Sequence, residues 1–508
     1  MTKSDKNEKD IVVLKSVVKN ECNEVKEVKN ERDSITKISD DKTNEKLNPD
    51  SHTVAKFSPL CRQTLSSLGA ITMTIASGLT IGFSATLLPQ LKETHNNILT
   101  SQEAGSWIAS IAALSMVPTC VVGGSIIEKF GRRNTHFIIS VPFFLAWMII
   151  ALADNLPLVL LGRFLTGGCA GFTGPLGSVF ISETTSPVYR GLFLSVISLA
   201  IAIGIFFTHC IGTWVHWQWA AMICGLVPIL SALLLAFVPE SPVWLISKQK
   251  VEEGVKSFHW YRGYDEEAKL ELSSIIEKYK SQSIEQPPTY IEMWKSVEFL
   301  KPLFIMFVFF GTVNFAGTNV FAFYSVEIIE KAVGKGVDNY LAMIVIDTIR
   351  LIMSTIACYV CKRYNRRLLC MVSGLFTGVA MLLLSLFLNF ASDRSEMALI
   401  PLSCLLLYIC SLSIGLIPLP WIMCAEIFPT KYRGQGSGVS AAIGFAASFV
   451  VVKIAPAMFS SFGNIISFFI YGVLCLIGTG ILYFILPETN RRTLQEIEDG
   501  IQKKSNSP

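Results

Sequence analysis

Gly-Gly-Ser-Ile-Ile-Glu-Lys-Phe-Gly-Arg-Arg, at residues 123–133, is the stretch that decides the fold, because a related stretch returns at residues 357–367. A second pair follows in the same order. Glu-Thr-Thr-Ser-Pro-Val-Tyr-Arg-Gly at 183–191 is matched by Glu-Ile-Phe-Pro-Thr-Lys-Tyr-Arg-Gly at 426–434. About half of the chain is therefore an internal repeat, and such a repeat in a membrane protein suits a site that opens alternately to either side.

Composition places the chain in a membrane. Its 508 residues are 51% hydrophobic and only 16% charged, whereas soluble domains hold about 25% charged residues. Twelve segments have the length of about 20 mostly apolar residues that a spanning helix needs. We predict an all-α polytopic membrane protein with 12 transmembrane helices in two pseudo-symmetric six-helix bundles. The apolar spans predict membrane lipid as a partner. The net charge of +4 is small and spread over many loops, so it argues for neither nucleic acid nor an acidic partner.

Charge patterning divides the chain and orients it. The predicted parts are a disordered N-terminal tail, a six-helix bundle, a helical linker, a second six-helix bundle and a C-terminal tail, at residues 1–56, 57–245, 246–299, 300–489 and 490–508. The basic loops all fall on one side of the predicted membrane, which makes that side cytosolic. We expect a multi-pass plasma-membrane protein, a monomer, with both termini in the cytosol.

Cysteine and histidine indicate neither a metal site nor a catalytic one. Most of the thirteen cysteines lie inside apolar segments, where they act as small apolar side chains. Cys358 and Cys361 form a Cys-x-x-Cys without a second pair, and the few histidines have no metal or triad setting. The sequence therefore predicts no cofactor, no metal and no enzyme.

These motifs, together with Pro-Glu-Ser-Pro at 239–242 and Pro-Glu-Thr at 487–489, match a family. Over residues 60–500 the chain resembles the sugar porter branch of the major facilitator superfamily. It is most similar there to insect facilitated trehalose and hexose transporters. The resemblance implies alternating access to a sugar site between the two bundles.

The resemblance also implies gating residues. Carboxylate–guanidinium pairs are directional and can break and re-form as units, so they suit a cytosolic latch between the halves. The alternative is plain anchoring of basic loops at the membrane surface. Tyr324 lies where relatives close the outer gate. The residues of the latch are Glu128, Arg132, Arg133, Glu183, Arg190, Glu240, Arg366, Arg367, Glu426, Arg433 and Glu488.

A sugar site needs amide or hydroxyl partners for ring hydroxyls and an aromatic face for the C–H side. In the family the seventh span carries several amides, and here only two remain. Pro418 and Pro420 interrupt the tenth span and expose an aromatic platform. The candidate substrate-binding residues are Ser198, Asn314, Asn319, Arg350, Ser413, Trp421, Phe445 and Ser448.

Charge inside the eighth span leaves two readings open. Asp347 and Arg350 can pair at i,i+3 and only support the helix, or Arg350 can face the cavity and contact an anionic substrate. Proton-driven relatives carry an Asp where this chain has Ser84, which favours downhill transport. Asp347 as a coupling carboxylate is the alternative.

The sequence therefore predicts a facilitative uniporter of a sugar such as trehalose or a hexose. Two alternatives remain open: a transporter of an organic anion or another polyol, and a nutrient sensor that does not transport.

Overall fold

The computed structural model describes residues 58–93, 98–282, 290–334, 337–390, 398–429 and 432–489. Every regular element within these ranges is a helix, which confirms the all-α prediction. The predicted tails, 1–56 and 490–508, lie outside the described residues.

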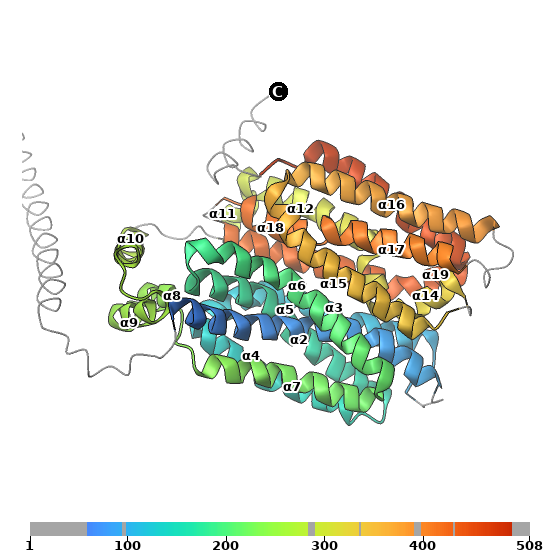
Figure 1. Ribbon diagram of the computed structural model, residues 1–508, viewed down its shortest axis with the longest axis horizontal. Coiled ribbons are helices and arrows are strands. Elements are labelled where there is room, and N and C mark those ends of the chain that lie inside the picture. Colours follow the sequence, from blue (N-terminus) through green and yellow to red (C-terminus); the bar gives the residue numbers. More distant parts are fainter. Residues whose placement is uncertain are drawn as a thin grey trace, which may run out of the picture. The chain divides into compact units, whose positions relative to one another are not determined.

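Six long helices form the first half, drawn from blue to green in Figure 1. Each is apolar enough to cross a membrane and corresponds to one of the first six predicted spans. Polar caps fix several of the helix starts: Ser101 Oγ accepts from the Ala104 amide at 3.1 Å, which satisfies an amide that the helix itself leaves free. The helices are α2 (Pro59–Glu93), α3 (Gln102–Phe130), α4 (Arg132–Ala151), α5 (Leu156–Thr184), α6 (Pro187–Trp214) and α7 (Trp217–Ala236).

Four shorter helices occupy the polar stretch between the halves: α8 (Pro242–Ser247), α9 (Val251–Arg262), α10 (Glu266–Gln282) and α11 (Tyr290–Lys295). Arg262 docks this stretch onto the first half. It donates to the Thr185 carbonyl at 2.5 Å and to Glu271 at 3.1 Å. Burial lowers the pKa of Arg262 to about 10, while the carboxylate of Glu271 opposes that shift. Arg190 lies 3.8 Å from the same carboxylate, so Glu271 sits between two cations.

The second half, yellow to red in Figure 1, has two interrupted spans. Its seventh span breaks at Gly317, whose φ of 85° lies in the left-handed region that glycine tolerates. Its tenth span breaks at Gly415, before Pro418. The helices are α12 (Val297–Phe315), α13 (Thr318–Phe323), α14 (Ser325–Val333), α15 (Asn339–Arg363), α16 (Arg366–Phe390), α17 (Leu399–Ile414), α18 (Pro418–Glu426) and α19 (Arg433–Ile485).

Among the described residues, eleven helical stretches are long and apolar enough to span a membrane, against twelve predicted. The difference lies in α19, whose 53 residues include both the eleventh and the twelfth predicted spans. A straight helix of that length would be about 80 Å long, far more than the bilayer's apolar core of about 30 Å. Gly463 interrupts it with a φ of 76°, so α19 consists of two spanning helices that meet at this residue.

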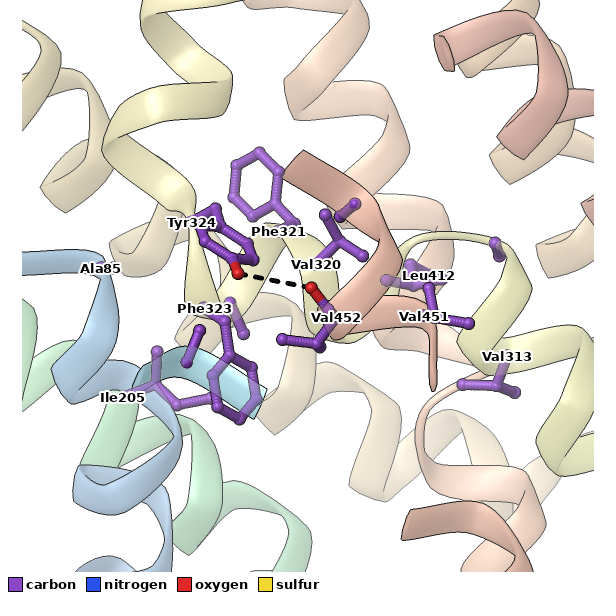
Figure 2. Packing of buried hydrophobic residues seen from close by; sticks show 14 of the residues in the cluster. Ala85, Ile205, Val313, Val320, Phe321, Phe323, Tyr324, Leu412, Val451 and Val452 are labelled. Atoms are coloured by element: carbon purple, nitrogen blue, oxygen red, sulfur yellow. Dashed lines mark hydrogen bonds between the residues drawn. The ribbon is translucent and has the colours of Figure 1, made fainter. Parts of the chain in front are cut away.

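Small residues let the helices approach closely. A Cβ on Gly78 of α2 would lie 2.3 Å from the Ile201 carbonyl oxygen and 2.9 Å from the Gly204 Cα of α6. Between the halves, α3 packs against α19 and α6 against α15. Figure 2 shows Phe323 and Tyr324, at the junction of α13 and α14, packed near Ile205 of the first half and Val452 of α19.

We expect Gly78→Ala to destabilise the protein by about 1–3 kcal/mol, because its methyl group would overlap a backbone oxygen that cannot move freely. Thermal unfolding in detergent measures the change. Gly480→Ala is the matched control: it is also helical, is exposed, and has nothing within 4 Å of the added Cβ. The control should raise stability by about 1 kcal/mol, since alanine is the better helix former. Equal effects at both positions would contradict the close α2–α6 contact.

Candidate functional site

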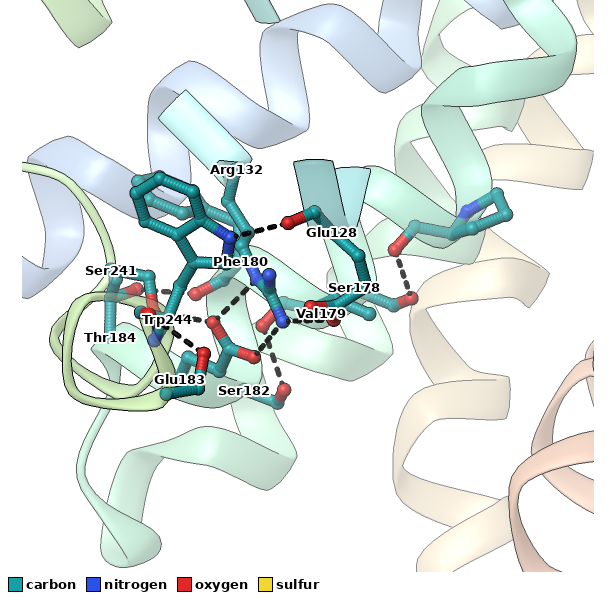
Figure 3. Close-up of polar contacts among 12 residues, drawn as sticks. Glu128, Arg132, Ser178, Val179, Phe180, Ser182, Glu183, Thr184, Ser241 and Trp244 are labelled. Carbon is teal, nitrogen blue, oxygen red and sulfur yellow. Dashed lines mark hydrogen bonds and ion pairs between the residues drawn. The ribbon is translucent and has the colours of Figure 1, made fainter. Parts of the chain in front are cut away.

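Arg132, at the start of α4, joins three helix ends of the first half (Figure 3). Its Nε and Nη2 donate to the two carboxylate oxygens of Glu183 at 2.9 and 2.8 Å, and Nη2 also donates to Glu128 at 2.8 Å. Ser241 Oγ donates to Glu183 as well. Arg132 is only 5% exposed, so this bidentate ion pair is shielded from water. We call the end of the protein that holds this cluster the basic end.

Glu240 acts differently from the other carboxylates of the cluster. Its Oε1 accepts from the backbone amides of Arg132 and Arg133 at 3.0 and 2.9 Å, so it caps the positive N-terminus of α4. Gly131 makes room for this cap, because its φ is 93° and an added Cβ would lie 2.6 Å from Glu240 Oε2. Arg133 turns the other way and donates to the Leu235 carbonyl, at the end of α7, at 3.0 Å.

The second half repeats most of this arrangement, but the Arg132–Glu128 pair has no counterpart because Lys362 stands at the position that matches Glu128. Arg366 Nη2 donates to Glu426 at 3.1 Å, and Thr489 Oγ1 donates to the same carboxylate at 2.6 Å. Glu488 caps α16 by accepting from the amides of Arg366 and Arg367 at 3.0 and 3.1 Å. Arg367 in turn donates to the Tyr483 carbonyl near the end of α19. The duplicated motifs therefore make duplicated contacts.

Each of these contacts lies within one half of the protein, so the clusters brace the halves internally. Glu240 and Glu488 bind the backbone amides at the starts of α4 and α16. Arg190 donates to the Thr185 carbonyl at 3.4 Å and lies near Glu271 of the linker. The side chain of Arg433 lies outside the described part of the chain. A latch between the two halves remains a prediction.

Polar contacts join the halves at the opposite end. Lys92 of α2 pairs with Glu327 of α14. Lys453 of α19 donates to Ser106 Oγ of α3 at 2.8 Å, and its Nζ lies 4.0 Å from the centroid of the Trp107 ring. Tyr324, the predicted gate residue, is buried nearby and donates to the Val452 carbonyl at 3.3 Å, within the second half (Figure 2).

Three of the predicted substrate-binding residues form one connected cluster. Asn319 Nδ2 lies 2.8 Å from Asn314 Oδ1 and 2.9 Å from Ser448 Oγ. Asn314 in turn donates to the carbonyls of Phe310 and Gly444, at 2.8 and 3.1 Å. The break in the seventh span positions these groups, because α12 ends just beyond Asn314 and α13 begins just before Asn319.

An aromatic group adjoins this amide cluster. Trp421 lies with its ring centroid 5.2 Å from that of Phe310 and 6.0 Å from that of Phe445. Phe310 also supplies a carbonyl to Asn314, so the amide and aromatic groups share a residue. Trp421 remains 37% exposed. Amides beside a partly exposed indole face are the combination that binds a sugar ring.

Arg350 pairs with Asp347 as its i,i+3 spacing predicted, with Nη1 3.3 Å from Oδ1. Sequence reasoning missed the other partner of this carboxylate. His209 of α6 has its Nδ1 2.5 Å from Asp347 Oδ2, and this contact crosses between the halves. The sequence did carry a signal for this partner. His209 is an ionisable residue inside an apolar span, and such residues are rare in membranes.

Ser413 and Ser198 share no hydrogen bond with the amide cluster among the described residues. Ser413 is buried, and its Oγ has no hydrogen-bond partner among the described residues. Ser198 is half-buried on α6.

Ser84 accepts from Arg163 Nη2 at 2.7 Å, and Arg163 Nη1 donates to the Thr80 carbonyl at 2.6 Å. Arg163 is thus held by neutral acceptors where the resemblance implies a carboxylate. The described residues hold no group of three or more His, Cys, Asp or Glu suited to a metal ion.

Comparison with known proteins supplies a family. A family model described as "Sugar (and other) transporter" matches residues 65–500. A facilitated trehalose transporter Tret1 of Drosophila grimshawi is 33% identical over 441 residues, covering 85% of this chain and 47% of that protein. The Tret1 of Apis mellifera ligustica is 31% identical over 451 residues, covering 87% and 89%. The chain spans about half the length of the Drosophila grimshawi protein.

Solved structures share the fold. The proton:xylose symporter XylE bound to 6-bromo-6-deoxy-D-glucose superposes with a TM-score of 0.72 at 20% identity, covering 87% of this chain and 99% of that one. An inward open conformation of the xylose transporter XylE from E. coli gives 0.70 at 20% identity, with the same coverage. The predicted fold, with membrane-spanning helices in two halves, is confirmed.

We expect Arg132→Gln to lower stability by about 3–5 kcal/mol, because it leaves the buried carboxylate of Glu183 without its cation. The double variant Arg132→Gln/Glu183→Gln should recover part of this loss. Lys256→Gln is the control: it breaks an exposed pair with Glu252, worth at most about 1 kcal/mol. Thermal unfolding in detergent compares the three, and equal losses for Arg132→Gln and Lys256→Gln would contradict a shielded pair.

Proposed function

Because this chain belongs to the sugar transporter family, we propose that it moves a sugar such as trehalose or a hexose down its gradient across a membrane. The two six-helix halves rock about a site between them, which opens alternately to each side. Trehalose is the first sugar to test, because the relatives named above are facilitated trehalose transporters.

The amide and aromatic clusters are the observation that carries this proposal. Asn314, Asn319 and Ser448 offer donors and acceptors in one connected group, and Trp421 provides an apolar face beside it. These polar groups hydrogen-bond to one another, so binding a sugar exchanges existing hydrogen bonds for new ones. Such exchange gives selectivity for hydroxyl patterns, because a ligand lacking the matching hydroxyl leaves a buried group unpaired.

The contacts between helices support rocking of rigid halves. The Arg132 and Arg366 clusters brace each half internally. The contacts of Lys92 and Lys453 cross between the halves at the end opposite the basic end. Crossing contacts of this kind can break while each half keeps its shape. A latch at the basic end that forms when the opposite end opens is part of this proposal.

Downhill transport is supported by the surroundings of Arg163. Ser84 and backbone carbonyls bind this guanidinium, and a hydroxyl does not titrate in the physiological range. A proton carrier at this position would need a carboxylate. We therefore propose uniport.

An organic anion or another polyol is the second candidate cargo. The favouring observation is Arg350, a buried guanidinium whose Nε has no hydrogen-bond partner among the described residues. The carboxylate of Asp347, 3.3 Å from Nη1, already compensates its charge, which favours a neutral cargo. The third possibility, a sensor without transport, gains no support from the contacts of the residues that the structure describes.

The membrane setting completes the proposal. Arg132, Arg133, Arg366 and Arg367 gather at the basic end, which the positive-inside rule places in the cytosol together with both termini. We propose a plasma-membrane location and a monomeric working unit. We also propose that the chain divides into a first bundle at 57–245, a linker at 246–299 and a second bundle at 300–489.

Uptake into vesicles reconstituted with the full chain tests the function. We expect saturable entry of labelled trehalose or glucose that stops when the sugar gradient collapses and continues when the proton gradient is dissipated. Uptake of organic anions but not of sugars would show that the cargo is an organic anion rather than a sugar. Specific sugar binding without any flux would leave the sensor as the surviving alternative.

We expect Asn319→Ala to raise the KM for sugar about tenfold, because it removes the amide that links Asn314 and Ser448, a loss of roughly 1–2 kcal/mol. Initial uptake rates over a range of sugar concentrations measure it. Ser403→Ala is the matched control, since this exposed hydroxyl bonds only to a carbonyl of its own helix. An unchanged KM in Asn319→Ala would remove this amide from the site.

A further inference from the structure

His209 lies between two acceptors in the membrane-embedded core. Its Nδ1 is 2.5 Å from Asp347 Oδ2, and its Nε2 is 3.1 Å from the carbonyl oxygen of Gly82. The side chains of His209 and Asp347 are 0% and 1% exposed. Both ring nitrogens of this histidine are thus engaged, although neither the amide cluster nor the basic-end clusters include it.

The number of protons follows from the geometry. A backbone carbonyl can only accept, so Nε2 must carry a hydrogen for the Gly82 contact to be a hydrogen bond. The contact between Nδ1 and Asp347 then needs a second hydrogen, carried by the ring or by the carboxyl group. A neutral imidazole beside a carboxylate holds only one of these two. We propose that His209 and Asp347 form a binding site for one additional proton, which bridges the two halves of the protein.

Charged and titratable groups around the pair come from several helices. Arg350 of α15 lies 3.3 Å from the second oxygen of Asp347 and stacks over Phe321, with its guanidinium carbon 5.6 Å from the ring centroid. The part of α2 that contacts His209, residues 66–88, contains no titratable residue. The other titratable groups are Cys210 beside Asp347, Cys224 near Thr208, Tyr408 near Arg350, and Arg163, which binds α2 at Thr80 and Ser84.

The proton site lies between the two halves, so proton binding depends on how the halves are arranged. His209 and Gly82 belong to α6 and α2 of the first half, whereas Asp347 belongs to α15 of the second. When α6 and α15 separate, the ring loses Asp347 and the additional proton passes to water. The proton therefore favours the present arrangement of the halves, since a ligand stabilises the state that binds it more tightly. Acidic pH fills the site and keeps the halves together, and alkaline pH empties it.

Nitrogen-15 NMR of the labelled full chain in detergent tests the site without any substrate. We expect one histidine of the six whose two ring nitrogens both bear hydrogen near neutral pH, or are both perturbed by a shared proton. This signal should disappear in His209→Gln and revert to a neutral ring in Asp347→Asn/Arg350→Gln. A His209 ring with one bare nitrogen across the whole range from about pH 5 to about pH 8 would overturn the proposal.

A second experiment, which rests on the proposed function, measures sugar exchange across the vesicle membrane with the same pH inside and outside. We expect wild-type exchange to be at least about threefold slower near pH 5.5 than near pH 8, because the ratio of occupied to empty proton sites changes about tenfold per pH unit. His209→Gln should make the profile flat. His216→Gln, at the exposed start of α7, should keep the wild-type profile.

The outcomes separate the two proposals. A wild-type profile that His209→Gln leaves unchanged would overturn the proton site while transport stands. Absence of exchange at any pH would overturn the proposed function, and the NMR result would still decide the site. Should His209→Gln not fold, the spectra of the wild type and of Asp347→Asn/Arg350→Gln decide alone.

Discussion

The structure depends on the need of buried charges and polar groups to find partners inside the protein, because the apolar core of a bilayer offers them none. Arg163 is 0% exposed and is held by backbone carbonyls of α2 and α3 together with Ser84. Arg132 is held instead by an ion pair with the carboxylate of Glu183 at the basic end. Each buried cation thereby fixes the relative positions of two or three helices. Charged residues are few in this chain, and those that are buried determine how its helices pack.

Duplication gives these contacts a pattern. In both halves one arginine pairs with a carboxylate, its neighbour binds carbonyls at a helix end, and a Pro-Glu motif caps the helix that starts with the arginines. The cap and the ion pair meet at the same helix start, because the cap binds the backbone amide of the arginine that makes the ion pair. These contacts hold the helix ends of each half together.

Contacts between the halves follow no such pattern. Lys92–Glu327, Lys453–Ser106 and His209–Asp347 each lie outside the repeated motifs. The contacts that hold a half together are thus separate from those that hold the halves to each other. Alternating access requires this separation, because the second set must break while the first remains. The amide cluster of Asn314 and Asn319 lies in the second half, next to the break in its seventh span, where backbone already departs from a regular helix.

The sequence by itself determined the twelve apolar spans, the repeat and the i,i+3 pair of Asp347 and Arg350, because length, order and helical spacing are local properties. It also placed Asn314, Asn319 and Ser448 in one candidate site, although only through a resemblance. Tertiary structure decided which carboxylate meets which partner. Glu240 binds amides rather than a guanidinium, and His209 meets Asp347 from 138 positions away in the chain. Such contacts depend on how helices from distant segments cross, and no local spacing encodes that crossing.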